Sequence, residues 1–113
     1  MKNKNKSIDE LKKISFALRK KGKKIVHCHG VFDLLHLGHI RHFEKSKSLG
    51  DVLIVSITHH DYVNKSPNQP YFNTNQRIEM LNSIEIIDYL CVNKSFDATE
   101  LISTIKPNFY CKG

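Results

Sequence analysis

The chain has 113 residues, enough for one small domain with a hydrophobic core, and 40% of them are hydrophobic. Its formal net charge is +7, but the excess lies at one end: residues 1–24 contain ten lysines and arginines against two acidic residues, and residues 25–113 contain eight against nine. A basic segment without interleaved aromatic residues is typical of a solvated extension, so we expect no nucleic-acid partner.

The composition also bounds the location of the protein. No apolar run approaches the length of a membrane span, and the start of the chain lacks the apolar core of a signal peptide. Cys28, Cys91 and Cys111 lie in apolar, strand-like runs and form no Cys-x-x-Cys pair. We interpret them as reduced packing residues, and we expect a cytoplasmic protein without a membrane partner.

The first elements follow from local signals. Residues 1–6 alternate lysine and asparagine, and we expect them to form a disordered basic tail ahead of a domain over residues 7–113. Ser7 and Glu10 have the spacing of a capping box, which begins an amphipathic helix that ends at Gly22. The apolar, β-branched run after it predicts a buried strand over residues 25–29.

A strand-to-helix turn over residues 29–39 contains two histidines, His36 and His39, in the first turn of the next helix. A helix N-terminus has unpaired backbone N–H groups and a partial positive charge, which suit a phosphate. Gly38 lets a ligand come close to the backbone, and an imidazole N–H can donate to a phosphate oxygen as charge builds up in a transition state. The alternative is that both are ordinary residues near an exposed helix end.

A nearly unbroken apolar run over residues 52–58 predicts a strand that is buried on both faces. His59, His60 and Asp61 follow it, and a metal site there is conceivable. Because adjacent side chains point in different directions, we prefer an ordinary polar loop and predict no metal site. A proline-containing loop with a single lysine, Lys65, then leads to a helix that begins near Thr74.

Two further strands are predicted over residues 88–92 and 108–111, with a helix between them that ends before Pro107. Strands that alternate with helices imply right-handed βαβ units. We therefore predict an α/β fold: a Rossmann-like three-layer sandwich with a parallel four-stranded sheet. The motif over residues 29–39 should lie at the carboxyl edge of the sheet, where the strand order reverses.

The pattern Gly30-x-Phe32-Asp33-x-x-His36-x-Gly38-His39 resembles the signature of the cytidylyltransferase-like nucleotidyltransferases, whose hallmark is His-x-Gly-His. Members transfer a nucleotidyl group from a nucleoside triphosphate to a phosphorylated small molecule and release magnesium pyrophosphate. The resemblance implies an enzyme with Mg²⁺ as cofactor, and it allows a homodimer.

The resemblance also assigns roles to residues. His36 and His39 would stabilise the α-phosphate, and Lys65 and Arg77 would neutralise the leaving pyrophosphate. Asp33 would orient either a histidine or the metal. The nucleotide-binding residues implied in this way are Gly30, Val31, Phe32, Asp33, His36, Gly38, His39, Arg77, Lys112 and Gly113. For Lys65 and Arg77, the alternatives are a solvated loop lysine and a surface arginine.

The ending Lys106-Pro107-x-x-x-x-Lys112-Gly113 resembles the sugar-phosphate members, including the nucleotidyltransferase half of bifunctional heptose-phosphate kinase/adenylyltransferases. It favours ATP as donor and a sugar 1-phosphate as acceptor, with CTP and glycerol 3-phosphate as the alternative. The family continues with a further strand and a Ser/Thr-rich motif. We therefore expect a domain truncated at its C-terminus, without its last strand and helix. A non-catalytic nucleotide-binding module is the alternative from another class.

Overall fold

The computed structural model describes residues 2–63 and 70–112. The elements in chain order are α1 (Ile8–Lys20), β1 (Ile25–Gly30), α2 (Leu37–Lys47), β2 (Val52–Thr58), the 3₁₀ helix η1 (His60–Tyr62), α3 (Thr74–Asn82), β3 (Tyr89–Asn93), α4 (Thr99–Ile105) and β4 (Phe109–Lys112). Each predicted strand is present, with its ends within one residue of the predicted positions.

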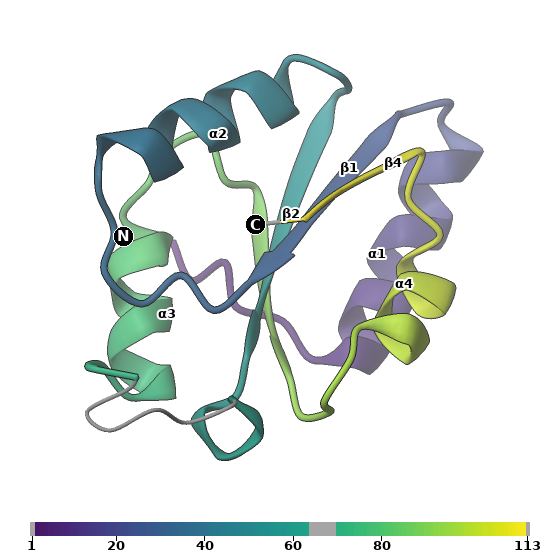
Figure 1. The fold of residues 1–113 in the computed structure, drawn as a ribbon. Helices are drawn as coiled ribbons and strands as arrows, with labels where there is room; N and C mark the ends of the chain where they lie inside the picture. Colours follow the sequence, from purple (N-terminus) through teal and green to yellow (C-terminus); the bar gives the residue numbers. More distant parts are fainter. Residues whose placement is uncertain (1, 64–69, 113) are drawn as a thin grey trace.

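The four strands form one parallel sheet in the order β3-β2-β1-β4 (Figure 1). The chain moves outward from β1 through β2 to β3 and then crosses back through α4 to place β4 on the other side of β1. The strand order therefore reverses between β1 and β4, and the turn that follows β1 lies at this point. The predicted α/β sandwich is confirmed, and the motif lies where such sheets bind ligands.

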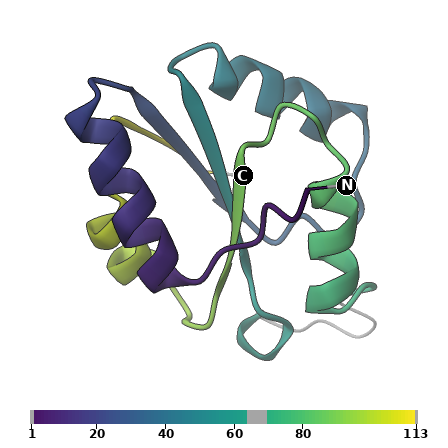
Figure 2. The same cartoon turned by 180° about the vertical axis from the view of Figure 1, so that it is seen from behind.

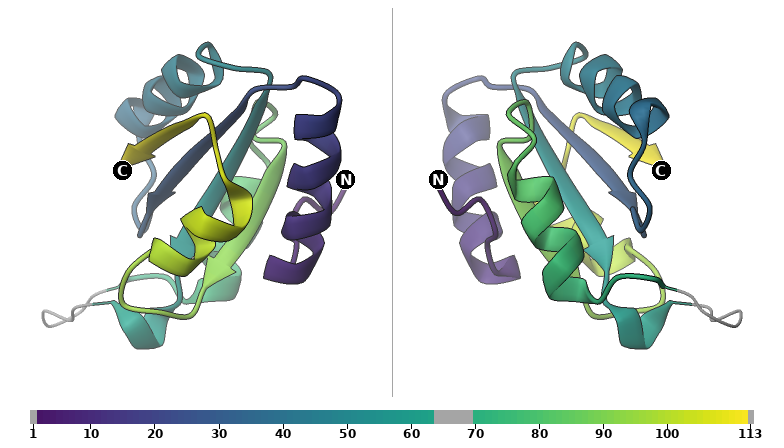
Figure 3. Two further views of the ribbon diagram at one scale, coloured as in Figure 1. Left: turned by 90° about the vertical axis from the view of Figure 1, so that its right-hand side faces the viewer. Right: turned by 90° about the vertical axis from the view of Figure 1, so that its left-hand side faces the viewer.

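Helices cover both faces of the sheet. Helices α2 and α3 lie on one face, and α1 and α4 lie on the other (Figures 1 and 3). Each face has its own apolar cluster. The first contains Val26, Cys28, Phe32, Phe43, Leu53, Val55, Ile57, Leu81, Ile87 and Leu90, and the second contains Leu11, Ile25, Ile54, Cys91, Leu101 and Ile105. Burial of these side chains stabilises the three layers.

The local signals that begin and end α1 have the expected geometry. Ser7 Oγ accepts a hydrogen bond from the Glu10 N–H at 3.1 Å, and the Glu10 carboxylate accepts one from the Ser7 N–H at 2.9 Å. Gly22 follows the helix with a φ of +75°, in the left-handed region that favours glycine. The capping box and the end of this helix are therefore confirmed.

The N-terminal segment differs from the expected disordered tail over residues 1–6. In its described part, the Lys6 N–H donates to the Leu90 carbonyl at 2.8 Å, and the Leu90 N–H donates to the Lys4 carbonyl at 2.9 Å. Figure 2 shows this purple segment passing beside β3. The outer edge of β3 has unpaired backbone groups, and the segment before α1 satisfies some of them, which local composition could not reveal.

Across residues 2–63 and 70–112, none of the helices combines the length and the apolar character needed to cross a bilayer.

Candidate active site

Helix α2 begins at the two histidines of the motif. His36 is the N-cap, and its Nδ1 accepts a hydrogen bond from the Gly38 N–H at 3.0 Å. His39 Nδ1 accepts one from the His36 N–H at 3.2 Å. This is a capping box built from two imidazoles. The ring centroids are 4.1 Å apart, so the two side chains share one end of the helix.

The capping hydrogen bonds decide which nitrogen of each ring carries the proton. A nitrogen that accepts from a backbone N–H uses its lone pair, so the neutral rings of His36 and His39 carry their protons on Nε2. Burial lowers the pKa of His39, and the neighbouring His36 and His42 lower it further, which favours the neutral ring near pH 7. The pair therefore offers two Nε2–H donors beside a helix N-terminus, an arrangement that suits phosphate oxygens.

The glycines of the motif make room for side chains of the motif itself. A Cβ on Gly38 would lie 2.7 Å from Cε1 of His36, so Gly38 leaves space for the capping ring, a role other than the predicted close approach of a ligand. A Cβ on Gly30 would lie 2.9 Å from Cζ of Phe32. Phe32 has a φ of +50° and is 4% exposed, and its ring lies edge-on to that of His39. The Phe32 side chain thus packs against the ring of His39, in a backbone conformation that is strained for a bulky residue.

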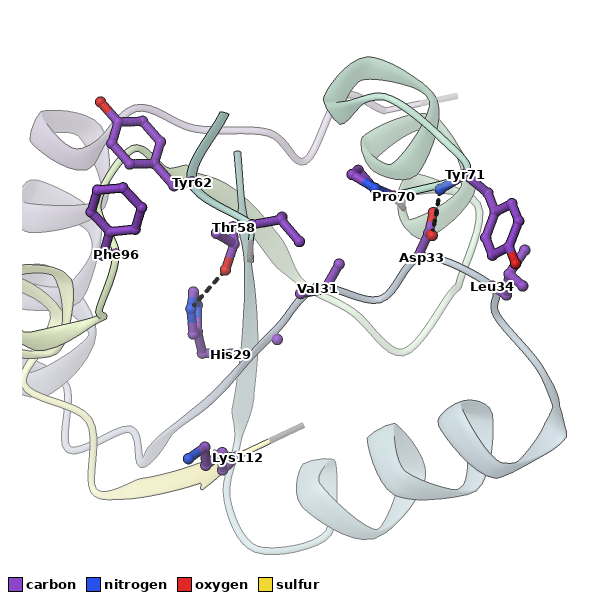
Figure 4. A pocket seen from close by; sticks show the side chains of 12 residues that line it. His29, Val31, Asp33, Leu34, Thr58, Tyr62, Pro70, Tyr71, Phe96 and Lys112 are labelled. Carbon is purple, nitrogen blue, oxygen red and sulfur yellow. Dashed lines mark hydrogen bonds between the residues drawn. The ribbon is translucent and has the colours of Figure 1, made fainter. Parts of the chain in front are cut away.

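Asp33 has a structural role that neither predicted alternative included. Its Oδ2 accepts a hydrogen bond from the Tyr71 N–H at 2.6 Å (Figure 4). Its Oδ1 accepts one from the Phe72 N–H at 2.9 Å. The carboxylate therefore anchors the residues that lead into α3 to the turn after β1. In this structure it orients neither histidine of the pair.

Arg77 is fully buried, so the alternative of a surface arginine is wrong. Its guanidinium donates to the carbonyls of Val31 at 2.9 Å and Thr58 at 2.8 Å, and its Nε donates to the Phe72 carbonyl at 3.2 Å. Burial lowers the pKa of Arg77, and the nearby Asp33 opposes this shift. Arg77 therefore joins three segments at the carboxyl edge of the sheet, and its contact with phosphate stays a prediction.

A cavity of about 610 Å³ opens beside the motif at the carboxyl ends of β1 and β4. Figure 4 shows Tyr62 and Phe96 on one side, Asp33 and Tyr71 on the other, and His29 between them. The lining also includes Gly30, Val31, Leu34, Thr58, Val63, Pro70 and Lys112. His36 and His39 are not among the lining residues; they follow the cavity-lining turn over residues 30–34 in the chain and lie at the N-terminus of α2.

The structure therefore places four of the predicted residues in the lining of one cavity: Gly30, Val31, Asp33 and Lys112. It places His36, Gly38 and His39 at the N-terminus of α2, outside this lining. Lys65 and Gly113 lie outside the described residues. Sequence reasoning missed His29 and Thr58 as lining residues. Polar residues at alternate positions of otherwise apolar strands, in 27–29 and 56–58, were the signal that could have found them.

His59, His60 and Asp61 come closer together than expected. The ligand atoms of these residues lie within 4.8 Å of one another, so the argument from diverging side chains was wrong. However, Nδ1 of His59 accepts the Asp61 N–H at 3.1 Å, and Nδ1 of His60 lies 2.7 Å from Thr74 Oγ1. Both nitrogens take part in the hydrogen bonds of a polar turn, and the absence of a metal site stays a prediction.

The fold and the histidine pair define a class: an α/β domain with a helix N-terminus suited to phosphate at the reversal of its strand order. The cytidylyltransferase-like family matches residues 27–113. The chain therefore belongs to the cytidylyltransferase-like family, a family of nucleotidyltransferase enzymes.

Curated relatives agree with this assignment. The chain is 39% identical over 110 residues to the bifunctional protein HldE of Nitratiruptor sp. and 37% identical over 110 residues to that of Aliarcobacter butzleri, with 96% of this chain covered in each case. It spans about a quarter of the length of these relatives, 24% and 23%.

A solved structure has the same fold. The lipopolysaccharide core biosynthesis protein of Thermoplasma volcanium superposes with a TM-score of 0.72 and 30% sequence identity. The superposition covers 79% of this chain and 73% of that one.

Proposed function

We propose that the protein transfers a nucleotidyl group from a nucleoside triphosphate to a sugar phosphate and releases pyrophosphate. The observation that carries this proposal is the pair of Nε2–H donors of His36 and His39 at the N-terminus of α2, next to a cavity large enough for a second substrate. The family assignment supports the same reaction class.

The reaction is an in-line displacement at the α-phosphorus. An oxygen of the acceptor phosphate forms a new P–O bond, the bond from the α-phosphorus to the bridging oxygen breaks, and that oxygen leaves with the electron pair as part of pyrophosphate. His36 and His39 donate hydrogen bonds to the non-bridging oxygens of the α-phosphate as its charge changes. No proton transfer from either ring is required, so their fixed tautomers serve as pre-positioned donors.

The leaving pyrophosphate needs positive charge, and we assign this role to Lys65 and Arg77 by the family resemblance. For Arg77, Nη2 is the nitrogen that we assign to phosphate, because its hydrogen bond to Thr74 Oγ1, at 3.5 Å, is the longest that the guanidinium makes to the described residues. Since the side chain is fully buried in this structure, the proposed contact requires nucleotide binding to expose Nη2. The other donors of the guanidinium hold backbone carbonyls, so the proposed contact requires Arg77 to keep that structural role at the same time.

Mg²⁺ is expected to accompany the triphosphate. The carboxylate of the motif, Asp33, accepts one backbone N–H on each oxygen, and each oxygen keeps a further lone pair, so it fits a metal contact made in addition to these hydrogen bonds. The phosphate oxygens and water would supply the other ligands, as is common for Mg²⁺ in nucleotide sites, and the ion would neutralise charge on the triphosphate.

The ending of the chain, from Lys106 to Lys112, favours ATP as donor and a sugar 1-phosphate as acceptor. CTP with glycerol 3-phosphate is the second candidate, and both keep the same reaction class. A nucleotide-binding module without catalysis is the remaining alternative.

The test is pyrophosphate release by the full-length protein with ATP or CTP, across a panel of sugar and polyol phosphates, and with reactions that lack an acceptor as controls. We expect release with ATP and a sugar 1-phosphate. Release with CTP and glycerol 3-phosphate alone would replace the substrates but keep the reaction. Nucleotide binding without release under any condition would favour the binding module.

A further inference from the structure

Three polar side chains form a row across the sheet at the floor of the cavity. In the parallel register, His29 of β1 pairs with Ser56 of β2 on one side and with Lys112 of β4 on the other. Residues that pair in adjacent parallel strands project from the same face of the sheet. The row therefore extends from the buried middle of the sheet to its exposed β4 edge, and both His29 and Lys112 line the cavity.

Behind this row lies a buried histidine. His27 is fully buried, and its Nε2 lies 2.7 Å from Ser56 Oγ. Ser56 Oγ also lies 2.7 Å from Nδ1 of His29. The remaining nitrogen of His27, Nδ1, is buried and has no hydrogen-bond partner among residues 2–63 and 70–112. One hydroxyl thus lies between two imidazoles. One arrangement of the three protons leaves no donor in this network without a partner.

In that arrangement, His27 Nε2–H donates to Ser56, and the Ser56 hydroxyl donates to His29 Nδ1. It leaves only a lone pair, on His27 Nδ1, without a partner. The reverse direction would bury an unpaired N–H on His27, and donation by both rings to Ser56 would leave the hydroxyl proton unpaired. The favoured direction places the remaining proton of His29 on Nε2.

Burial keeps both rings neutral in this arrangement. It lowers the pKa of His27 to about 3, with a further contribution from His29, and it lowers the pKa of His29 as well. A neutral His29 with its proton on Nε2 is a hydrogen-bond donor toward the cavity. Its partner in the structure is Thr58 Oγ1 at 3.3 Å, a long contact that a ligand oxygen can replace (Figure 4).

We propose that His29 and Lys112 bind the phosphate group of the phosphorylated acceptor, and that Ser56 and His27 act as positioning residues that fix the tautomer of His29. The proposal rests on the nucleotidyltransferase function stated above. A neutral N–H donor beside a cation suits an oxygen-rich anion. The acceptor is the substrate assigned to this site, because the histidine pair that would hold the α-phosphate of the nucleotide lies outside the cavity.

The tautomer can be tested without any catalysis. Long-range ¹H–¹⁵N correlation spectra of the full-length protein with ¹⁵N-labelled histidine should show His27 and His29 neutral with the proton on Nε2. Ser56→Ala should release His29 into a mixture of tautomers. Ser15→Ala is the matched control, because Ser15 is an equally buried serine whose hydroxyl donates to the Leu11 carbonyl within α1. A wild-type His29 with its proton on Nδ1 would overturn the proposed arrangement.

Inorganic phosphate is the second probe. Titration should shift the Nε2 resonance of His29 in the wild-type protein and in Ser15→Ala, and Lys112→Met should weaken this binding. The titration measures phosphate binding at His29 even if no acceptor in the panel supports pyrophosphate release. An error in the proposed phosphate site can therefore be distinguished from an error in the proposed function. An unaffected His29 resonance would contradict the subsite.

Steady-state kinetics show whether His29 binds the phosphate of the acceptor or a phosphate of the nucleotide. Loss of a hydrogen bond to a charged group should raise the KM for the sugar phosphate about 10- to 100-fold in His29→Ala, with the KM for the nucleotide changed less than about twofold. His29→Asn, which keeps an N–H donor, should recover part of this loss. A KM change confined to the nucleotide, or no change in either KM, would refute the assignment to the acceptor.

Discussion

The two faces of the sheet differ in the polarity of their strand side chains. On the face under α2 and α3, the strand residues are apolar along their length, with Val26, Cys28, Leu53, Val55 and Ile57 all buried. On the face under α1 and α4, the strands carry the buried Ile25 and Ile54 in their first halves and polar residues after them: His27 and His29 on β1, and Ser56 and Thr58 on β2.

This difference arises because the helices on the two faces cover the strands with apolar side chains to different extents. On the second face, the apolar cluster ends near the middle of the strands, and the carboxyl halves form the floor of a cavity. The first face is thus apolar throughout, and the second combines an apolar cluster at one end with the floor of the cavity at the other. Five predictions test this comparison.

The largest effect is expected at Arg77, the buried cation beside the apolar face. Arg77→Met keeps much of the side-chain volume but leaves the carbonyls of Val31, Thr58 and Phe72 without their donor. We expect a loss of about 4 kcal/mol in the free energy of unfolding, because unsatisfied buried carbonyls cost about 1–3 kcal/mol each. Urea unfolding measures it. Unchanged stability together with lost turnover would indicate a phosphate contact alone.

His39 is expected to matter for turnover more than for stability. His39→Ala should lower turnover by about two to three orders of magnitude, the loss typical of a donor to a transition state. Removal of one half of the α2 capping box should cost only about 1 kcal/mol of stability. Pyrophosphate release and thermal unfolding of the same variant test both statements. Unchanged turnover would remove His39 from the mechanism.

A matched pair on β2 compares the two faces directly. Leu53→Ala, on the apolar face, should destabilise the domain by about 2–5 kcal/mol through the cavity it creates. Ser56→Ala, on the polar face, should cost about 1 kcal/mol, because it removes one hydroxyl that serves two histidines. Denaturant midpoints of the two variants measure these losses of stability. Equal losses would contradict the proposed difference between the two faces.

The buried His27 predicts how stability depends on pH. Its pKa in the folded state is about 3, well below the ordinary value of 6.5. Above pH 6.5 the ring is neutral in both states, so it adds no pH dependence. Below pH 6.5 the unfolded chain binds the proton and the folded one does not, so stability should fall by up to about 1.4 kcal/mol per pH unit toward pH 3.

His27→Gln, which cannot titrate, provides the comparison for this pH effect. The unfolding free energies of wild type and variant, measured from pH 7 to pH 4, should differ in slope below pH 6.5. Parallel curves would show that His27 is protonated in the folded state.

The smallest effect concerns the N-terminal segment on the edge of β3. Lys6→Pro removes the N–H that donates to the Leu90 carbonyl and should cost about 1 kcal/mol, whereas Lys6→Ala keeps this N–H and should be nearly neutral. Urea unfolding of the two variants measures the difference. Equal stability would mean that the segment does not pair with β3 in solution.

Most of the fold could be predicted because its signals are local. The apolar run over residues 52–58, the Ser7 capping box and the glycine after α1 each act within one element, and all have the predicted structure. The histidine pair belongs to the same category, because His36 and His39 lie three residues apart in a single helical turn. Local periodicity and capping chemistry determine such features before any tertiary contact forms.

The partners of Asp33, Arg77 and His29 were not predictable in this way. Asp33 binds backbone groups 38 and 39 residues away, Arg77 reaches the Val31 carbonyl across 46 residues, and His29 meets Ser56 across 27. The sequence by itself determined the parallel α/β arrangement and the donor pair at the start of α2, through patterns within single elements. Only the tertiary structure decided which side chains became supports and which became the floor of a cavity, because strand register and burial bring together residues that local patterns cannot pair.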